Sequence, residues 1–226
     1  MKDESEEVLG LRLPHREYDR IETAVVDLYT KLQVTNVPVD VFSIVKQMGW
    51  EAKPYSELPY DAVQKLRESH SDGCSFFNPT LKQYVICYDD HKPMVRVRFT
   101  IMHEVGHIVL DHKQESDLAN QMANHFAAYS LAPTPLIGCY KCEDYIEGAN
   151  IFNVSRECAS ICFQRYMNWF DYGGDYYKPY EIKLRRLFFP NDEDVTGSDY
   201  NLFSRSTSVV SGLQTNAIQE PTFLES

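Results

Sequence analysis

Two histidines and a glutamate near the middle of the chain have the residue types and the spacing of a metal site. The segment reads His103-Glu104-Val105-Gly106-His107 and matches the pattern HExxH. Residues four apart lie on the same face of an α-helix, so the two imidazoles would point to one place with the carboxylate of Glu104 beside them. This pentapeptide is therefore the first candidate for chemistry.

The chemistry that this arrangement predicts is peptide hydrolysis assisted by zinc. Two neutral imidazoles bind Zn²⁺ at about 2.0 to 2.1 Å, and an open coordination position can hold water. The carboxylate of Glu104 would take a proton from this water as it attacks a peptide carbonyl, and would then deliver the proton to the departing amine. The alternative interpretation is a chance match, a risk that any short motif carries.

The motif lies in the C-terminal half of a predicted helix over residues 93–110. Pro93 suits the first turn of this helix, and an apolar stripe along it faces a core, formed by Phe99, Met102, Val105 and Val109. Gly106 inside a helix costs about 1 kcal/mol relative to alanine, which indicates that another element packs closely there. A second predicted helix, over residues 116–131, follows and could bring a further ligand.

The rest of the chain predicts an α+β fold in which a small β-sheet packs on a mainly helical domain. Helical spacing of apolar residues and turn signals predict further helices at 18–32, 39–48, 155–170 and 180–189, and a β-hairpin at 74–88. We expect one domain over residues 18–190. Residues 1–17 are predicted to be a flexible N-terminus, and residues 191–226 a disordered tail, because both are polar and lack a sustained period.

Composition limits the function classes. The formal net charge of -11 repels phosphate backbones, which disfavours a DNA-binding regulator and favours a protein or peptide partner. The acidic start MKDESEEVLG is unlike a secretory signal, and no stretch has the length and apolar character of a membrane span, so we expect a cytoplasmic protein that binds neither membrane nor nucleic acid.

The six cysteines are expected to be thiols, since a reducing compartment disfavours disulfides. Cys139 and Cys142 form a C-x-x-C in a predicted loop, and Cys158 and Cys162 follow on a predicted helix. A four-cysteine zinc site is one interpretation, and a redox pair at the first two is another. The helical setting and apolar neighbours of the second pair favour buried thiols.

Two segments of the sequence resemble the ImmA/IrrE family of metallopeptidases. They are RVRFTIMHEVGHIVLDH at residues 96–112 and ANHFAAYSLAP at residues 123–133. With weaker similarity on either side, the resemblance covers most of residues 18–190. It implies a zincin-like metallopeptidase fold, Zn²⁺ as cofactor, a cytoplasmic setting, and cleavage of a helix-turn-helix transcriptional repressor, often one encoded beside the protease on a prophage or other mobile element.

The resemblance also implies a third metal ligand, a glutamate three residues before the Ala-Asn pair of the second segment. That position is Asn120 here, and Met122 stands where a second glutamate is frequent. A helical wheel places Asn120 on a face of small residues that could approach the motif helix. We therefore predict a metal site of His103, His107 and Asn120, with Asp117, one turn earlier, as the substitute. The alternative for Asn120 is an amide that hydrogen-bonds between helices.

Four other polar residues near the site are weighed against structural roles. Asn124 is expected to be structural. Asp111 could orient the imidazole of His107, although a solvent-facing carboxylate at a helix end is commoner. His112 and His125 are expected to be surface or partly buried residues and not ligands.

The leading hypothesis from the sequence is a zinc-dependent endopeptidase with Glu104 as the catalytic base, acting on a cytosolic regulatory protein. The rival hypothesis is a degenerate, non-catalytic zincin-like protein that binds a regulatory partner without cleaving it, because Asn120 replaces the expected acidic ligand.

Overall fold

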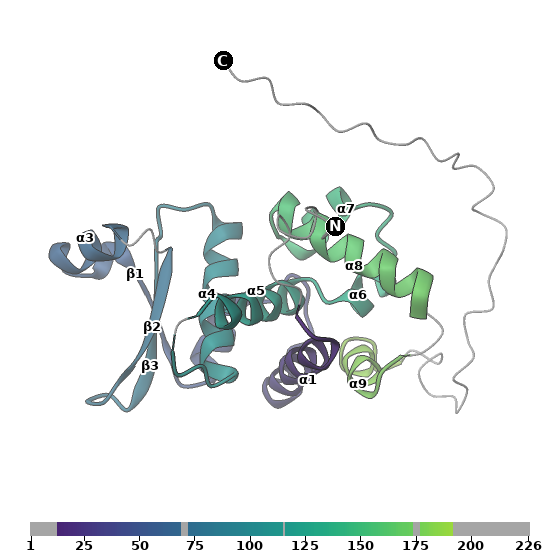
Figure 1. Cartoon of the computed structure of the whole chain (residues 1–226), viewed down its shortest axis with the longest axis horizontal. Coiled ribbons are helices and arrows are strands. Elements are labelled where there is room, and N and C mark those ends of the chain that lie inside the picture. The colour runs from purple at the N-terminus through teal and green to yellow at the C-terminus, as the bar shows by residue number, and fades with distance from the viewer. Residues whose placement is uncertain (1–12, 69–71, 115, 174–176, 192–226) are drawn as a thin grey trace, which may run out of the picture.

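The computed structural model describes residues 13–68, 72–114, 116–173 and 177–191 (Figure 1). The expected flexible N-terminus and disordered tail fall mainly on residues 1–12 and 192–226, which lie outside the described residues. The described part of the N-terminus differs from the expectation. Leu13 is buried, and helix α1 (His15–Leu32) begins three residues before Tyr18.

A small sheet packs on a larger helical part, which confirms the predicted α+β class (Figure 1). After α1 the elements are α2 (Val41–Gln47), β1 (Glu51–Pro54), the short 3₁₀ helix η2 (Tyr55–Glu57), α3 (Tyr60–Glu68), β2 (Gly73–Asn78), β3 (Gln83–Tyr88), α4 (Met94–Val109), α5 (Asp117–Leu131), α6 (Thr134–Cys139), α7 (Tyr145–Phe152), α8 (Arg156–Gly173) and α9 (Pro179–Phe188).

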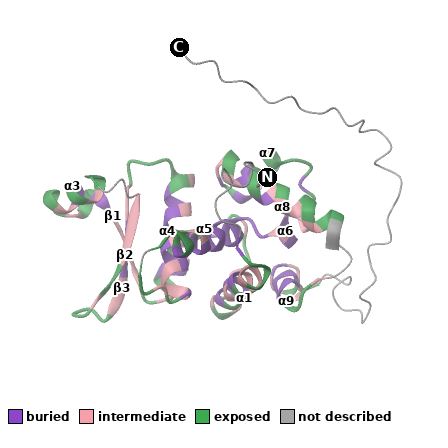
Figure 2. Ribbon diagram, in the orientation of Figure 1, coloured by how far each residue is buried: buried purple, intermediate pink, exposed green. Residues whose placement is uncertain are grey.

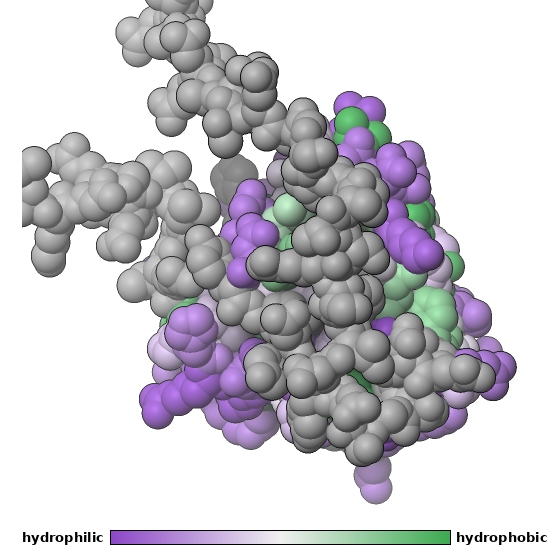
Figure 3. Space-filling model, turned by 90° about the vertical axis from the view of Figure 1, so that its right-hand side faces the viewer, coloured by the Kyte–Doolittle hydropathy of each residue, from purple (hydrophilic) through white to green (hydrophobic). Residues whose placement is uncertain are grey.

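Helix α4 lies between the sheet and the remaining helices. Figure 1 shows α4 along one side of the sheet and α3 at the other, with α5 crossing α4 and α1, α6, α8 and α9 beyond it. Both α4 and α5 are largely buried (Figure 2). At the end of the molecule opposite the sheet, hydrophilic residues predominate where described residues are visible, with apolar ones between them (Figure 3). The helix that carries the motif is therefore the centre of the fold.

The sheet has the strand order β1-β3-β2. The predicted hairpin is confirmed: β2 and β3 are antiparallel, and the side chain of Asn78 accepts hydrogen bonds from the amides of Thr80 and Leu81 in the turn. Strand β1 pairs in parallel with β3 and was not predicted, because the four residues Glu-Ala-Lys-Pro are too short a run to establish a period and end in a proline.

The predicted helices are confirmed with small shifts at their ends. Asp40 caps α2 by accepting hydrogen bonds from the amides of Phe42 and Ser43. Helices α6 and α7 were not predicted. Each is short, and α6 begins directly after Pro133 with Pro135 in its first turn. Amides of the first turn have no acceptor within the helix, so proline, which has no N–H, is tolerated there. Cys139, expected in a loop, is the last residue of α6.

The close packing predicted at Gly106 is present. A Cβ atom added at Gly106 would lie 3.1 Å from the Cβ, Cγ and Cδ1 atoms of Phe126, a fully buried residue of α5. Glycine at this position therefore sets how closely α4 and α5 approach. Gly148, inside α7, has no atom within 4 Å of such a Cβ.

These two glycines give a matched test of the packing. We expect Gly148→Ala to raise the free energy of unfolding by about 1 kcal/mol, because alanine favours the helix and meets open space. The same propensity gain at Gly106→Ala is opposed by overpacking against Phe126, which costs about 1 to 3 kcal/mol. Denaturant unfolding should place Gly106→Ala at least about 1 kcal/mol below Gly148→Ala. Equal gains in the two variants would show that the helices do not meet closely at Gly106.

Candidate metal centre

Helix α4 places the two motif histidines one turn apart, with their rings converging. The Nε2 atoms of His103 and His107 lie 3.0 Å apart, and their ring centroids are separated by 4.7 Å. Two nitrogens bound to one tetrahedral zinc ion at about 2.0 to 2.1 Å would be about 3.3 Å apart. The pair therefore fits a shared metal ion with only a small adjustment.

An amide from α5 orients the first histidine. Nδ1 of His103 lies 2.8 Å from Oδ1 of Asn124. Because that oxygen only accepts, Nδ1 carries the ring proton and Nε2 keeps its lone pair toward the shared position. Burial lowers the pKa of His103 to about 4, with a smaller contribution from His107, so the ring is neutral at pH 7. Asn124 was expected to be structural, and this interhelical hydrogen bond gives it a positioning role.

A third histidine supports the second one from the turn after α4. Asp111 adopts a left-handed conformation with φ of 57°, and the amide of His112 donates to the carbonyl of His107. This turn brings Nδ1 of His112 to 3.0 Å from Nδ1 of His107. One of these nitrogens donates and the other accepts. His112 therefore contacts the site, which its sequence position alone did not reveal.

The carboxylate of Glu104 points to the sheet. Glu104 is 9% exposed, and the hydroxyl of Ser75 on β2 donates to its Oε2 atom at 2.7 Å. The same strand approaches α4 closely one step earlier, since a Cβ at Gly73 would lie 2.3 Å from Cγ2 of Thr100. Sequence analysis missed Ser75, because no pattern links a strand residue to one 29 positions later on a helix.

The two candidates for a third ligand both lie on exposed positions at the start of α5. Asn120 and Asp117 are exposed, and Ser116 caps this helix. Among the described residues, no group of three His, Cys, Asp or Glu ligand atoms within 4.8 Å of one another includes His103 and His107, so Asp117 stays a prediction. Asn120 remains a prediction. His125, on the same helix, points to α1, where Nε2 lies 2.9 Å from Oε1 of Glu22.

Comparison with known families agrees with this geometry. Residues 62–160 match the family model of the IrrE N-terminal-like domain, Peptidase_M78. Over these residues the chain is similar to the IrrE N-terminal-like family. The match runs from α3 into the first turns of α8 and so includes the hairpin, the motif helix and α5. No curated protein and no solved structure is significantly similar to the chain.

This similarity supports a metallopeptidase type of function and a protein substrate in general terms. The zincin-like α+β fold expected from the sequence is consistent with the observed IrrE-like domain. No described helix combines the length and the apolar character needed to span a bilayer.

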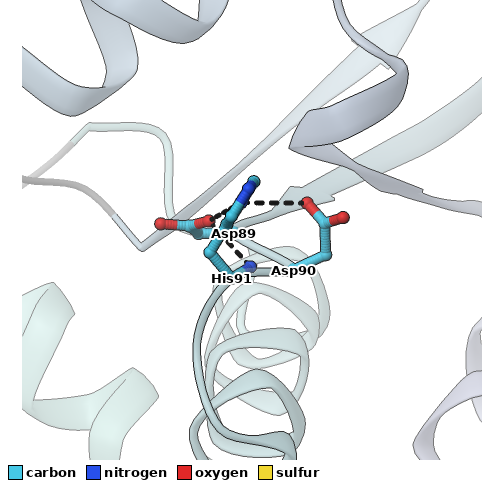
Figure 4. Close-up of side chains that lie close together, drawn as sticks. All are labelled: Asp89, Asp90 and His91. Carbon is cyan, nitrogen blue, oxygen red and sulfur yellow. Dashed lines mark hydrogen bonds and ion pairs between the residues drawn. The ribbon is translucent and has the colours of Figure 1, made fainter.

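A second group of possible ligands in the IrrE-like domain lies between β3 and α4. Asp89, Asp90 and His91 have side chains close together (Figure 4). Their oxygens are already used by the backbone: Oδ1 of Asp89 accepts from the amide of His91, and Oδ1 of Asp90 accepts from the amide of Ser56. These bonds account for the group as a turn that holds η2 beside the start of α4.

The six cysteines are thiols, as expected, and none of them forms a disulfide. Cys162 is buried, and its thiol donates weakly to the carbonyl of Ala128 at 3.7 Å. Burial raises the pKa of Cys142 to about 11, which opposes an activated thiolate at the C-x-x-C pair. No four-cysteine group occurs among the described residues. Cys142 and Cys162 are buried, as the thiol interpretation expects, whereas Cys139 and Cys158 are only partly buried.

The two asparagines of α5 provide a matched test of the site. Asn124→Ala should weaken zinc binding about 10- to 100-fold, because His103 loses the acceptor that fixes its ring. Asn120→Ala, one turn earlier on the same helix, weakens zinc binding only if Asn120 is itself a ligand. Competition with a chromogenic chelator measures both affinities. An unchanged affinity in Asn124→Ala would mean that the hydrogen bond does not orient the histidine.

Proposed function

We propose that this protein is a zinc-dependent endopeptidase that cleaves a cytosolic regulatory protein. The observation that carries the proposal is the convergence of the His103 and His107 Nε2 atoms at 3.0 Å, on the helix turn that also holds Glu104. The other ring nitrogens lie beside Asn124 and His112, which leaves the two Nε2 atoms as the pair that would hold a cation.

When bound, zinc would polarise the scissile carbonyl and acidify the attacking water. Glu104 would accept the proton of that water and pass it to the nitrogen of the leaving amine, which needs a carboxylate held in one place. The hydrogen bond from Ser75 to Oε2 supplies this restraint. Burial of Glu104 limits its contact with bulk solvent.

The edge of the sheet offers a way to align a peptide with these groups. Among the described residues, β2 lies at an edge of the sheet and pairs as a strand only with β3. Natural edge strands are commonly protected by charged residues or proline, and the sequence Gly-Cys-Ser-Phe-Phe-Asn has neither. A substrate segment in extended conformation could pair with β2 and pass the level of Ser75 and Glu104.

For the substrate we propose a helix-turn-helix transcriptional repressor encoded near this protein on a prophage or other mobile element. The support is the resemblance of the motif segments to the ImmA/IrrE family together with a net charge of -11, which favours a protein partner over nucleic acid. A cytoplasmic location follows from the same proposal.

The lack of an acidic third ligand among the described residues favours a second candidate function, in which the protein binds its partner without cleaving it. The described residues place no acidic side chain as a third ligand beside the histidines, and the family position for it is Asn120. A site with two histidines and a neutral third group binds zinc less tightly than one with a carboxylate. The second candidate is therefore a zincin-like protein that binds its partner without cleaving it.

Two variants separate these functions. Glu104→Gln should keep zinc bound and abolish cleavage, because it removes the base and leaves the ligands, whereas His103→Ala should lose both. The measurements are zinc stoichiometry on purified protein and cleavage of the repressor encoded beside the gene. Cleavage by Glu104→Gln would refute the mechanism. Binding of the repressor by wild-type protein without zinc or cleavage would favour the non-catalytic candidate.

A further inference from the structure

A row of aromatic side chains crosses the sheet next to the candidate site. Phe77 on β2 lies directly opposite Tyr84 on β3, and their ring centroids are 5.3 Å apart. Trp50 precedes β1, beside Tyr84, with ring centroids 5.4 Å apart. Both contacts are edge-to-face. Trp50, Tyr84 and Phe77, here called the aromatic row, thus form a continuous apolar surface across three strands.

This row shares the face of the sheet that meets α4. Successive side chains of a strand alternate between faces, so Phe77 is on the same side as Ser75, which bonds to Glu104. The row also lies near the turn after α4. The pKa of Lys113 is raised mainly by Asp111 and slightly by the phenol of Tyr84, so Lys113 and Tyr84 are within electrostatic range. Phe77 is therefore two residues along β2 from Ser75, the partner of the Glu104 carboxylate, and Tyr84 is near Lys113.

The row is only partly covered. Phe77 is 51% exposed, while Trp50 and Tyr84 are half-buried. The rings are fixed by their mutual contacts, so a side chain laid on them would lose water at little cost in the ordering of the protein. A surface of this kind favours a large apolar side chain over a small or charged one.

We propose that the aromatic row determines specificity by binding a large apolar side chain of the substrate near the scissile bond. The inference rests on the proposed endopeptidase function, because it assumes an extended peptide beside β2. A peptide that pairs with β2 at Ser75 presents alternate side chains to the α4 face, and the one next along the strand would meet Phe77. Phenylalanine or leucine at that position should bind about 10- to 100-fold more tightly than alanine or aspartate.

Phe76 provides a matched control. It is the neighbouring residue, has the same side chain and is 50% exposed, but it lies on the opposite face of the sheet, level with Val85. Phe77→Ala and Phe76→Ala therefore remove equal surface from the same edge strand. Only the first removes it from the face that carries Glu104.

The test measures binding to the Glu104→Gln protein, with zinc present, of blocked heptapeptides Thr-Ser-Thr-X-Thr-Ser-Thr in which X is Phe, Leu, Ala or Asp. Trp50 is one of two tryptophans, so its fluorescence in a Trp169→Phe background reports occupancy of the row. We expect binding of the Phe and Leu peptides with at least tenfold preference, retained in Phe76→Ala and lost in Phe77→Ala. No preference, no binding of any peptide, or equal loss in both variants would overturn the inference.

A parallel digestion of a proteome-derived peptide library by the wild-type protein separates this inference from the proposed function. Cleavage without enrichment of large apolar residues at any fixed position would leave the endopeptidase in place and remove the specificity role. Phe77-dependent peptide binding without any cleavage would keep the aromatic row as a peptide-binding surface and remove the endopeptidase function.

Discussion

The close contact between α4 and α5 at Gly106 and Phe126 is the constraint on which the candidate site depends. With no side chain at Gly106, the ring of Phe126 lies against the backbone of α4. Asn124 is two residues from Phe126 on the same helix, and this approach lets its amide reach Nδ1 of His103. A wider spacing of the two helices would leave the imidazole without its acceptor, and its ring would turn more freely. The packing of α4 against α5 therefore also fixes the orientation of the His103 ring.

The opposite side of α4 is held just as firmly. Thr100 lies against Gly73, and Glu104 accepts from Ser75, so β2 and α4 are in fixed register. Nearer its start, the buried guanidinium of Arg98 donates to the carbonyls of Val39, Phe152 and Asn153, which ties α4 to the segments around α2 and α7. Charged hydrogen bonds to otherwise unpaired carbonyls are strong in a buried setting. The helix thus presents histidines toward α5 and the carboxylate toward the sheet without freedom to rotate.

The sequence was sufficient for those features that depend on local pattern. The helix of the motif, α5, the hairpin, the cap at Asp40 and the close approach at Gly106 all follow from spacing or from the properties of one residue. Strand β1 and helices α3, α6 and α7 are too short to show a period. Ser75 and His112 reach the site through contacts that tertiary structure creates: one crosses from a strand, and the other depends on Asp111 adopting a conformation usually taken by glycine.

The replacement of the expected glutamate by Asn120 has two consequences of opposite sign. A neutral third ligand attracts a divalent cation less than a carboxylate does, so the affinity of the site for zinc falls. The same neutrality leaves more of the positive charge on the ion, and sites with three neutral ligands can bring the pKa of water to about 7. With Asn120 as the proposed third ligand, the change would therefore lie in how much of the protein holds zinc and not in the reactivity of zinc-bound water. Whether this domain acts as a peptidase or only as a binding protein is then decided by how tightly His103, His107 and their supporting hydrogen bonds retain the metal.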